Sequence, residues 1–402
     1  MEKTVIKIGE ISKLINGDRG KNYPSQNDIV DDGEIPFINA GHLIDNHVNF
    51  DDMNYISREK FDKLSSGKVI EGDILYCLRG SLGKKALVRN IKDGAIASSL
   101  VIIRPDKKRV SSEYLLLALE STSIKSQLVK ANNGSSQPNL SAKSVSDYII
   151  KVHSIDKQEE IIGKINKVKS IIDSRKLQLA LLDDLIKSRF VEMFGDPVEN
   201  TMNWKVCKLV DLSVQINSGN TPKGGEQVYV DKGITFFRSQ NVWKDRLEMD
   251  DIAFIDKETH ENMKRSSLKH GDILMTKTGR INTENSSLGR AALYLGEDDA
   301  ANVNGHVYFI RLKPDVNNEF ILKILVSNEY LGYIRSVCVG GIDKRQLNKN
   351  HIEDFPIICP PKDMQRKFID FVHQVDKLKA EAQKSLNETQ ILLDSLMQKY
   401  FK

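Results

Sequence analysis

The sequence predicts an α+β fold in which a duplicated α/β domain alternates with two long helices that form an antiparallel coiled coil within the chain. Two observations predict this arrangement. One segment near the middle of the chain and one at its end carry apolar residues at the alternating three- and four-residue steps of a coiled-coil helix. The segments that precede these two helices also align with one another over most of their length.

The two predicted helices share one apolar pattern in matching register. In the first, residues 158–194, the apolar seam consists of Ile161, Ile165, Val168, Ile172, Leu179, Leu182, Ile186 and Met193, with Arg175 and Arg189 as polar interruptions. In the second, residues 365–402, it consists of Phe368, Val372, Val375, Ala382, Leu386, Leu393, Leu396 and Tyr400, with Lys379 and Thr389 as interruptions. The two seams are 207 residues apart (368 − 161 = 207). Two such helices in one chain are predicted to pair with each other.

The two domains are predicted from matching segments. Each opens on an alternating, strand-like run (5–11 and 206–212), passes a Gly-rich loop (16–21 and 217–225) and reaches a Gly-Asp-Ile-Leu strand (72–75 and 271–274). Each then continues to a short helix (113–129 and 319–337) and a closing strand (147–150 and 354–357). The predicted boundaries are 1–154 for domain 1, 155–197 for the central helix, 198–359 for domain 2 and 360–402 for the C-terminal helix.

Composition limits the function classes. The chain has 402 residues, 40% hydrophobic and 28% charged, which is typical of a globular protein with more than one core. No apolar run reaches the roughly 18 residues of a membrane-spanning helix, so a cytoplasmic location without membrane attachment is expected. Cys77, Cys207, Cys338 and Cys359 lie far apart in the sequence, which predicts reduced thiols and no metal site. The net charge of +4 permits nucleic-acid binding without indicating it.

A duplicated domain on a paired-helix arm is suited to contacting two places on a long partner. A helix of residues 158–194 is about 55 Å long at 1.5 Å per residue, and duplex DNA repeats roughly every 34 Å. The framework residues of the two domains repeat while their loop residues differ, and loops on a fixed scaffold are where binding specificity varies. The pattern therefore predicts two readers of unlike half-sites, that is, an asymmetric bipartite target.

The junction after the first long helix carries a family resemblance. Residues 182–197 read Leu-Asp-Asp-Leu-Ile-Lys-Ser-Arg-Phe-Val-Glu-Met-Phe-Gly-Asp-Pro and are followed by Asn203-Trp204. This string resembles the central junction of the specificity subunits of type I restriction-modification enzymes. Residues 156–162 and 360–369 resemble the starts of that family's two long helices, so the resemblance spans the whole chain. The first domain differs in opening without a counterpart of Trp204.

The resemblance implies a set of roles and partners. Each domain would be a target-recognition domain that reads one half of a site in double-stranded DNA. The paired helices would be the spacer and the docking surface for two methyltransferase subunits, and restriction (translocating endonuclease) subunits would complete the enzyme. The chain itself would be non-catalytic and hold no cofactor. S-adenosylmethionine, ATP and Mg²⁺ would be bound by the partner subunits only.

No catalytic motif is evident in the sequence. Residues 80–85 lack the spacing of a phosphate-binding P-loop, and residues 359–362 lack the amide and aromatic residues of an aminomethyltransferase motif. Asp106 with Glu113, or Asp315 with Glu319, could imitate a nuclease carboxylate pair, but no ExK lysine follows. Two alternatives stay open: a fused enzyme that combines specificity with cleavage or methylation, and a coiled-coil scaffold with protein-binding heads.

The residues expected to contact DNA lie in loops and are basic, or carry amides or hydroxyls that can bond phosphates or base edges. In domain 1 they are Arg19, Lys21, Arg79, Lys84, Lys85, Ser135, Ser136 and Gln137. In domain 2 they are Lys223, Arg238, Gln240, Lys277, Arg280, Arg290, Lys344 and Arg345. Arg238 and Gln240 are the stronger candidates for base readout because each can bond bidentately to a base edge. For any single residue, a solvated surface charge is an equally good interpretation.

Overall fold

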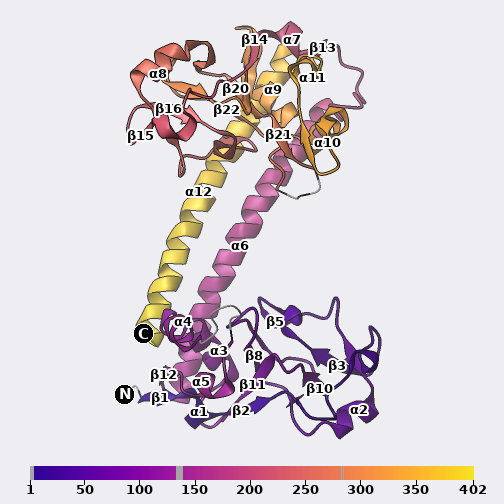
Figure 1. The fold of residues 1–402 in the computed structure, drawn as a ribbon, viewed down its shortest axis with the longest axis vertical. Coiled ribbons are helices and arrows are strands. Elements are labelled where there is room, and N and C mark those ends of the chain that lie inside the picture. The colour runs from indigo at the N-terminus through magenta and orange to yellow at the C-terminus, as the bar shows by residue number, and fades with distance from the viewer. Residues whose placement is uncertain (1–3, 133–138, 282, 284) are drawn as a thin grey trace. The chain divides into compact units, whose positions relative to one another are not determined.

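The chain folds as two compact units, each built of one α/β domain and a stretch of each long helix. In the computed structural model, which describes residues 4–132, 139–281, 283 and 285–402, unit 1 comprises Met1–Leu177 with Gln383–Lys402. Unit 2 comprises Gln178–Ala382. Figure 1 shows the domain of each unit beside its stretches of the long helices α6 (Ile155–Phe194) and α12 (Lys362–Phe401).

Unit 1 is organised around one mixed sheet with a smaller sheet beside it. The larger sheet has the strand order β2 (Ser12–Asn16), β11 (Leu100–Pro105), β8 (Ile74–Cys77), β9 (Lys85–Leu87), β5 (Asn46–Val48) and β4 (Leu43–Ile44). The smaller has the order β6 (Tyr55–Ile56), β3 (Ile35–Ile38), β10 (Gly94–Ile96) and β7 (Lys68–Val69). The strands β1 (Thr4–Lys7) and β12 (Ile149–Val152) pair separately. The helices of the domain are α1 (Ile8–Ile11), α2 (Arg58–Lys63), α3 (Ser112–Glu120), α4 (Thr122–Ala131) and α5 (Ala142–Ser146).

Unit 2 repeats this plan with its own additions. Its main sheet has the order β14 (Ser213–Ser218), β24 (Val307–Leu312), β20 (Ile273–Thr276) and β22 (Ala291–Leu293). The second sheet has the order β15 (Tyr229–Val230), β19 (Ala253–Ile255), β16 (Ile234–Phe237) and β23 (Ala301–Val303). Smaller pairings join β13 (Val206–Lys208) to β27 (Pro356–Ile358), β17 (Val242–Trp243) to β18 (Arg246–Leu247), and β21 (Thr278–Arg280) to β26 (Lys344–Gln346) and β25 (Val339–Gly340). The helices are α7 (Leu209–Leu212), α8 (Lys257–Asn262), α9 (Asn318–Leu325), α10 (Asn328–Val337) and α11 (Lys349–Glu353).

The repeat that the sequence predicts is present in the topology. The order β2-β11-β8-β9 in unit 1 has its counterpart in β14-β24-β20-β22 in unit 2. Each unit also contains a parallel pair at the same place in its second sheet, β3 with β10 and β16 with β23. The two domains therefore share one α+β scaffold, as predicted.

The opening run of each domain (5–11 and 206–212) was predicted to be a strand throughout, and this is wrong for its second half. Only its first residues form strands β1 and β13, because a single helical turn (α1 or α7) follows in each copy. The turn is held at both ends: the amide of Ile8 donates to the carbonyl of Tyr148, and the hydroxyl of Ser12 donates back to the carbonyl of Ile8. Leu209 and Ser213 make the same bonds in unit 2.

The short helix predicted in each domain is in fact two helices. Ser121 ends α3 and begins α4, because its side chain accepts a hydrogen bond from the amide of Ile124 and so caps the second helix. In unit 2, Ser327 caps α10 in the same way by accepting from the amide of Tyr330. In each domain a serine within the apolar helical pattern is therefore the boundary between two helices, which the hydrophobic periodicity alone did not predict.

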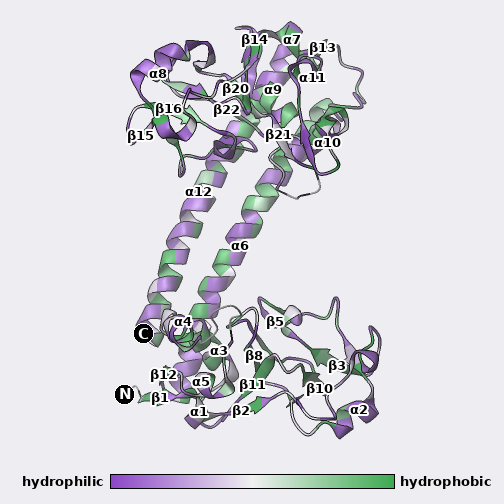
Figure 2. Cartoon of the chain, in the orientation of Figure 1, coloured by the Kyte–Doolittle hydropathy of each residue, from purple (hydrophilic) through white to green (hydrophobic). Residues whose placement is uncertain are grey.

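The long helices match the predicted periodicity and pair antiparallel in each unit. In unit 2, Phe190 of α6 lies 5.4 Å from Phe368 of α12 between ring centroids, and the earlier Asp183 forms a 2.6 Å ion pair with the later Lys379. Moving back along α6 therefore means moving forward along α12. In unit 1, the N-terminal residues of α6 pack in one core with the C-terminal residues of α12. Figure 2 shows apolar residues interleaved with polar ones along both helices. The predicted intramolecular coiled coil is confirmed.

A glutamine in the first turn of each long helix ties that helix to its domain. The Gln158 side chain is fully buried, accepts a hydrogen bond from the amide of Ser111 and donates to the carbonyls of Arg109 and His153. Its counterpart Gln365 donates only to the carbonyl of Pro360. The start of α6 is therefore fixed more firmly by hydrogen bonds than the start of α12.

The end of α6 is set by the Met-Phe-Gly-Asp-Pro junction. Gly195 adopts a left-handed conformation (φ +73°), the usual way to stop a helix. A Cβ at this position would lie 2.2 Å from the Thr201 hydroxyl oxygen. The indole N–H of Trp204 donates to the last helical carbonyl, that of Phe194, at 3.0 Å.

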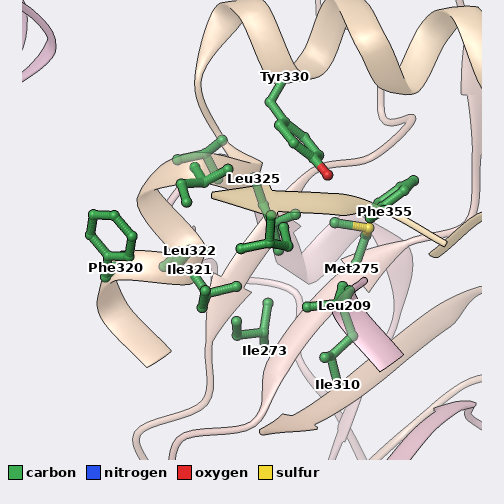
Figure 3. Close-up of a cluster of buried hydrophobic side chains, with 14 of the residues drawn as sticks. Leu209, Ile273, Met275, Ile310, Phe320, Ile321, Leu322, Leu325, Tyr330 and Phe355 are labelled. Atoms are coloured by element: carbon green, nitrogen blue, oxygen red, sulfur yellow. The ribbon is translucent and has the colours of Figure 1, made fainter. Parts of the chain in front are cut away.

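The core of unit 2 joins the domain to both helices. Phe190 and Phe194 of α6, Phe320 of α9 and Phe368 of α12 form one aromatic cluster with centroid distances of 5.0 to 6.4 Å. Figure 3 shows the neighbouring part of this core, where side chains of α9 gather with Ile273, Met275 and Tyr330. Burial of so many large apolar side chains, at roughly 1.5–3 kcal/mol each, makes the helix stretch an integral part of the unit.

Candidate nucleic-acid interface

In unit 1, one backbone connection gathers the loops at the end of β8. Leu78, directly after β8, donates its amide to the carbonyl of Ser99 in the β10–β11 turn at 2.8 Å. Its own carbonyl accepts from the amide of Leu140, in the segment that leads to α5, also at 2.8 Å. Three segments far apart in the sequence are thereby fixed side by side.

Unit 2 repeats this connection with different side chains. Lys277, directly after β20, donates its amide to the carbonyl of His306 at 2.9 Å and accepts from the amide of Leu347 at 2.8 Å. The backbone framework of the interface is therefore the same in both domains. A leucine and a serine in one copy stand where a lysine and a histidine stand in the other.

The Gly-rich loop of unit 1 joins the same region and is fixed by a buried carboxylate. Asp18 accepts hydrogen bonds from the amide of Gly20 and from the amide and hydroxyl of Ser65, each at 2.8 Å. The bonds from Gly20 and Ser65 lower the pKa of Asp18 below its ordinary value. The neighbouring Arg19 is exposed and its guanidinium donates to the carbonyl of Ser98, while Lys21 is exposed.

The Gly-rich loop of unit 2 approaches its sheet even more closely. A Cβ on Gly219 would lie 2.0 Å from the carbonyl oxygen of Val303, so only glycine fits there. The loop continues through Asn220, whose side-chain oxygen accepts from the guanidinium of Arg265 at 3.2 Å. Lys223 follows and is exposed.

The basic residues after β8 do not share one surface. Arg79 is exposed and forms an isolated β-bridge with Asn139, within the gathered loops. Lys84 is exposed, with its ammonium 3.3 Å from the carbonyl of Ala40. Lys85 instead lines a pocket of 470 Å³ together with Glu120 of α3, and burial there lowers its pKa. Ser135, Ser136 and Gln137 lie outside the residues that the structure describes.

In unit 2, strand pairing brings three of the predicted residues together. Arg280 of β21 lies directly opposite Lys344 of β26, and Arg345 is the next residue on that strand. Arg280 also forms an ion pair of 3.3 Å with the exposed Asp343. The Nε atom of Arg345 is buried without a hydrogen-bond partner among the described residues. Lys277 lies nearby in sequence, with its ammonium 5.7 Å from the centre of the Tyr308 ring.

Arg238 and Gln240, the two candidates for direct base readout, are both engaged by one carboxylate. Arg238 forms an ion pair of 3.0 Å with Asp251, and its side chain is only 12% exposed. Its guanidinium also lies 5.7 Å from the ring centre of Tyr229. The amide of Gln240 donates to the same Asp251 carboxylate at 3.2 Å. In this structure Arg238 is held against its own domain, and Gln240 remains exposed.

Arg290 is one of two arginines that contact the ring of Trp243, an arrangement that the sequence did not indicate. Its guanidinium lies 3.9 Å from the ring centre of Trp243, and that of Arg246 lies 5.4 Å from the same ring. The backbone carbonyls of Asn285 and Ser286 accept hydrogen bonds from Arg290. Desolvation by burial lowers the pKa of Arg290. Trp243 has no aromatic counterpart in the first domain. The alignment of the two repeats therefore did not identify it as a candidate residue.

Charged side chains of each domain lie beside the long helices of its unit. In unit 1, Glu120 accepts from the Asn46 amide at 2.6 Å and from the ammonium of Lys169 on α6 at 2.7 Å. In unit 2, Lys323 pairs with Asp245 beside Asp376 of α12, the residue 207 positions after Lys169. The position that holds the cation Lys169 on α6 therefore holds an anion, Asp376, on α12.

The described residues form neither a metal-binding cluster nor a membrane-spanning helix. Across the part of the chain that the structure describes, no three His, Cys, Asp or Glu side chains gather closely enough to hold a metal ion. Within the described helices, including α6 and α12, no stretch is both long and apolar enough to cross a membrane.

Comparison with known proteins gives a consistent result. The family model described as "Type I restriction modification DNA specificity domain" matches residues 1–181 and 202–389. The chain is 21% identical over 420 residues to the type I restriction enzyme StySPI specificity subunit of Salmonella potsdam, covering 98% of this chain and 87% of the relative. It is 24% identical over 395 residues to the MjaIX specificity subunit of Methanocaldococcus jannaschii, covering 91% and 86%.

Two solved structures share the fold. One is a chain from a study of complex assembly and conformational transition of the type I R-M system, with a TM-score of 0.63, 16% identity, and 99% and 97% of the two chains covered. The other is the S subunit of a type I restriction-modification system from M. genitalium, with a TM-score of 0.55, 15% identity, and 100% and 96% covered.

Proposed function

Because the chain belongs to the family of type I restriction-modification specificity subunits, we propose that its two domains each read one half of an asymmetric bipartite DNA site. The paired helices α6 and α12 act as the spacer that sets the gap between the half-sites. They also dock two methyltransferase subunits, to which restriction subunits are added.

The observation that carries this proposal is the shared loop framework with unlike side chains. The bonds from Leu78 to Ser99 and Leu140 reappear as the bonds from Lys277 to His306 and Leu347. Equal backbone geometry places the two sets of loops alike on their scaffolds, whereas unlike side chains present different donors, acceptors and charges. DNA sequence is read by such side chains in the grooves, while phosphate contacts set position. Two equal scaffolds with unlike loops suit two different half-sites.

Docking of a protein partner on α6 is supported by apolar residues off the seam. Leu177, Leu181 and Leu185 follow one another at four-residue steps on one helical face and are 46–61% exposed. Exposed apolar side chains gathered in one stripe mark protein interaction surfaces more often than isolated ones. We expect Leu181→Asp with Leu185→Asp to weaken assembly with the methyltransferase subunit, measured by co-purification. The exposed polar pair Lys187→Ala with Asp184→Ala is the matched control.

The catalytic groups are expected on the partners. We propose that this chain is non-catalytic and acts in the cytoplasm, with S-adenosylmethionine on the methyltransferase subunits and ATP with Mg²⁺ on the restriction subunits. The complex would then methylate adenines in its site, and the chain purified alone would neither methylate nor cut DNA.

Domain exchange tests the two-reader proposal. The chain is expressed with its cognate methyltransferase subunit, and methylated adenines are mapped by methylome sequencing. Replacement of residues 1–154 by the equivalent domain of a relative should change one half of the methylated motif only. Replacement of residues 198–359 should change the other half only. If either exchange alters both halves, the assignment of one half-site to each domain is wrong.

A further inference from the structure

The sheet β21–β26–β25 in unit 2 carries an apolar side chain at its free end. Ile342, in the turn between β25 and β26, is 88% exposed, the most exposed large apolar side chain among the described residues. It follows Gly340 and Gly341, and no atom lies within 4 Å of where a Gly341 Cβ would stand. A side chain as apolar as isoleucine loses roughly 1.5–3 kcal/mol of burial free energy by standing in water. Its exposure leaves the whole side chain available to a partner.

The strands behind this tip carry like charges on one face. Arg280 and Lys344 are directly opposite one another. Arg280 also pairs with the exposed Asp343 at 3.3 Å, which offsets part of the positive charge, and Lys344 adds a second cation beside that pair. Thr278 and Gln346 form the next cross-strand pair on the same side and supply a hydroxyl and an amide. The opposite side faces the domain, since a Cβ on Gly279 would lie 2.2 Å from the amide nitrogen of Leu288. The outward face is thus basic, polar and able to bond base edges.

A polyanion with apolar bases beneath its phosphates matches this surface. A β-ribbon of two strands fits a groove of duplex DNA, and apolar wedges such as isoleucine insert between base steps in proteins that bend DNA. A protein partner could cover Ile342, but it would not account for the two cations, Arg280 and Lys344, on the strands behind it. Among the described residues of unit 1, Arg79 forms the corresponding bridge with Asn139.

We propose that the sheet β21–β26–β25 is the groove-entering element of domain 2, in which Ile342 wedges against the bases while Arg280 and Lys344 hold the flanking phosphates. This rests on the proposed function, and it adds that the half-site read by domain 2 is locally unstacked on binding. The half-site would therefore be selected partly for its deformability at the step that Ile342 enters.

The complex of this chain with its cognate methyltransferase subunits provides the test. Duplexes carrying the methylated motif are labelled with 2-aminopurine at successive positions of the half-site assigned to residues 198–359. With the wild-type chain, 2-aminopurine fluorescence should rise at one step. Ile342→Ala should abolish that rise and weaken binding about ten-fold, because an apolar contact of this size is lost. The dependence of affinity on salt should stay unchanged, since no phosphate contact is removed.

Leu295→Ala is the matched control, because Leu295 is a 67% exposed apolar residue of the same unit outside the sheet. It should bind DNA and raise fluorescence as the wild type does. Wild-type affinity and fluorescence in Ile342→Ala would overturn the wedge. So would a variant whose only defect is weaker assembly with the methyltransferase subunit, because Ile342 would then be a protein contact. Absence of site-specific binding by the wild-type complex would instead overturn the proposed function, and the wedge with it.

Discussion

Asp272 and Arg311 form a bidentate ion pair inside domain 2, with oxygen–nitrogen distances of 2.9 and 2.7 Å and a carboxylate side chain that is 1% exposed. Asp73 and Arg104 form the same pair in domain 1, with both distances at 2.8 Å. The aspartates are those of the repeated Gly-Asp-Ile-Leu strands. Each also accepts the amide three residues before it, so it fixes the turn into the strand. These aspartates and arginines stabilise the domain fold, and we do not expect them to contact DNA.

Removal of the carboxylate should therefore destabilise its own unit. Asp272→Ala leaves the guanidinium of Arg311 without its partner, which should lower the free energy of unfolding of unit 2 by about 3–5 kcal/mol. Denaturant titration followed by tryptophan fluorescence measures this, since Trp204 and Trp243 both lie in unit 2. Lys362→Ala is the control, because its pair with Asp315 is exposed on both sides and should contribute less than about 1 kcal/mol. Equal effects of the two variants would contradict the structural role of Asp272.

Gln158 should be more important to stability than its repeat counterpart. Gln158→Leu removes the three hydrogen bonds that the buried Gln158 side chain makes with the amide of Ser111 and the carbonyls of Arg109 and His153, at about 0.5–1.5 kcal/mol for each bond lost. Gln365→Leu removes one bond only and should cost less. Thermal unfolding of the two variants beside the wild type compares them, and a larger loss in Gln365→Leu would refute the assignment.

Alanine substitution of two glycines, one within α6 and one at its C-terminal junction, should change the stability of the chain in opposite directions. Gly195→Ala meets both a left-handed backbone and the Thr201 hydroxyl, so a loss of stability of at least about 1–2 kcal/mol is expected. Gly163 lies within α6 with no atom within 4 Å of an added Cβ, so Gly163→Ala should stabilise the chain by about 0.5–1 kcal/mol. Differential scanning calorimetry measures both. A neutral Gly195→Ala would mean that the helix end is not fixed by this residue.

The salt dependence of DNA binding should separate phosphate contacts from structural lysines. Arg280→Ala and Lys344→Ala should each reduce the slope of log affinity against log salt by about one unit. Lys85→Ala should leave the slope unchanged, because Lys85 lies in the pocket with Glu120. Fluorescence anisotropy of the complex on labelled duplex at several salt concentrations gives the slopes. A reduced slope in Lys85→Ala would show that this lysine reaches DNA after all.

The Gly-rich loop of domain 1 should lose its order in acid. Asp18 has a pKa below its ordinary 3.8 in the folded chain because of its bonds from Gly20 and Ser65. A carboxylate with a depressed folded-state pKa contributes stability that is present above about pH 4 and is lost as the pH falls through the folded value. Amide exchange of residues 17–21 should accordingly accelerate in that range. Asp18→Asn should exchange fast at every pH, and a pH-dependent transition surviving in that variant would assign the effect to another group.

Much of the scaffold could be predicted from the sequence because it is periodic and occurs twice. The heptad seam located α6 and α12, and the repeated Gly-Asp-Ile-Leu run located β8 and β20. Local capping was not visible in that periodicity: Ser121 and Ser327 each divide a predicted helix, and a helical turn interrupts each opening run. Such boundaries depend on single side-chain bonds rather than on a pattern.

The candidate interface was predictable as a set of loops but not residue by residue. Arg280, Lys344 and Arg345 meet only because strands 64 residues apart in the chain (344 − 280 = 64) pair, a contact that composition and spacing do not specify. Lys84 and Lys85 are adjacent in sequence yet enter different surroundings. Arg238 was chosen for its chemistry, and its pairing with Asp251 depends on a contact 13 residues away. Whether each candidate touches DNA stays a prediction.

The charges that tie each domain to its helix limit how the chain can recombine. Lys169 meets Glu120 in unit 1, whereas the matching helix position in unit 2 is Asp376, beside Lys323. Domain 1 transplanted onto α12 would bring Glu120 toward Asp376 and would lose the ion pair between Glu120 and Lys169. We therefore expect a replacement domain to fit best when it comes from the same half of a related chain. Shuffling between the two halves of one chain would demand a simultaneous change of the helix.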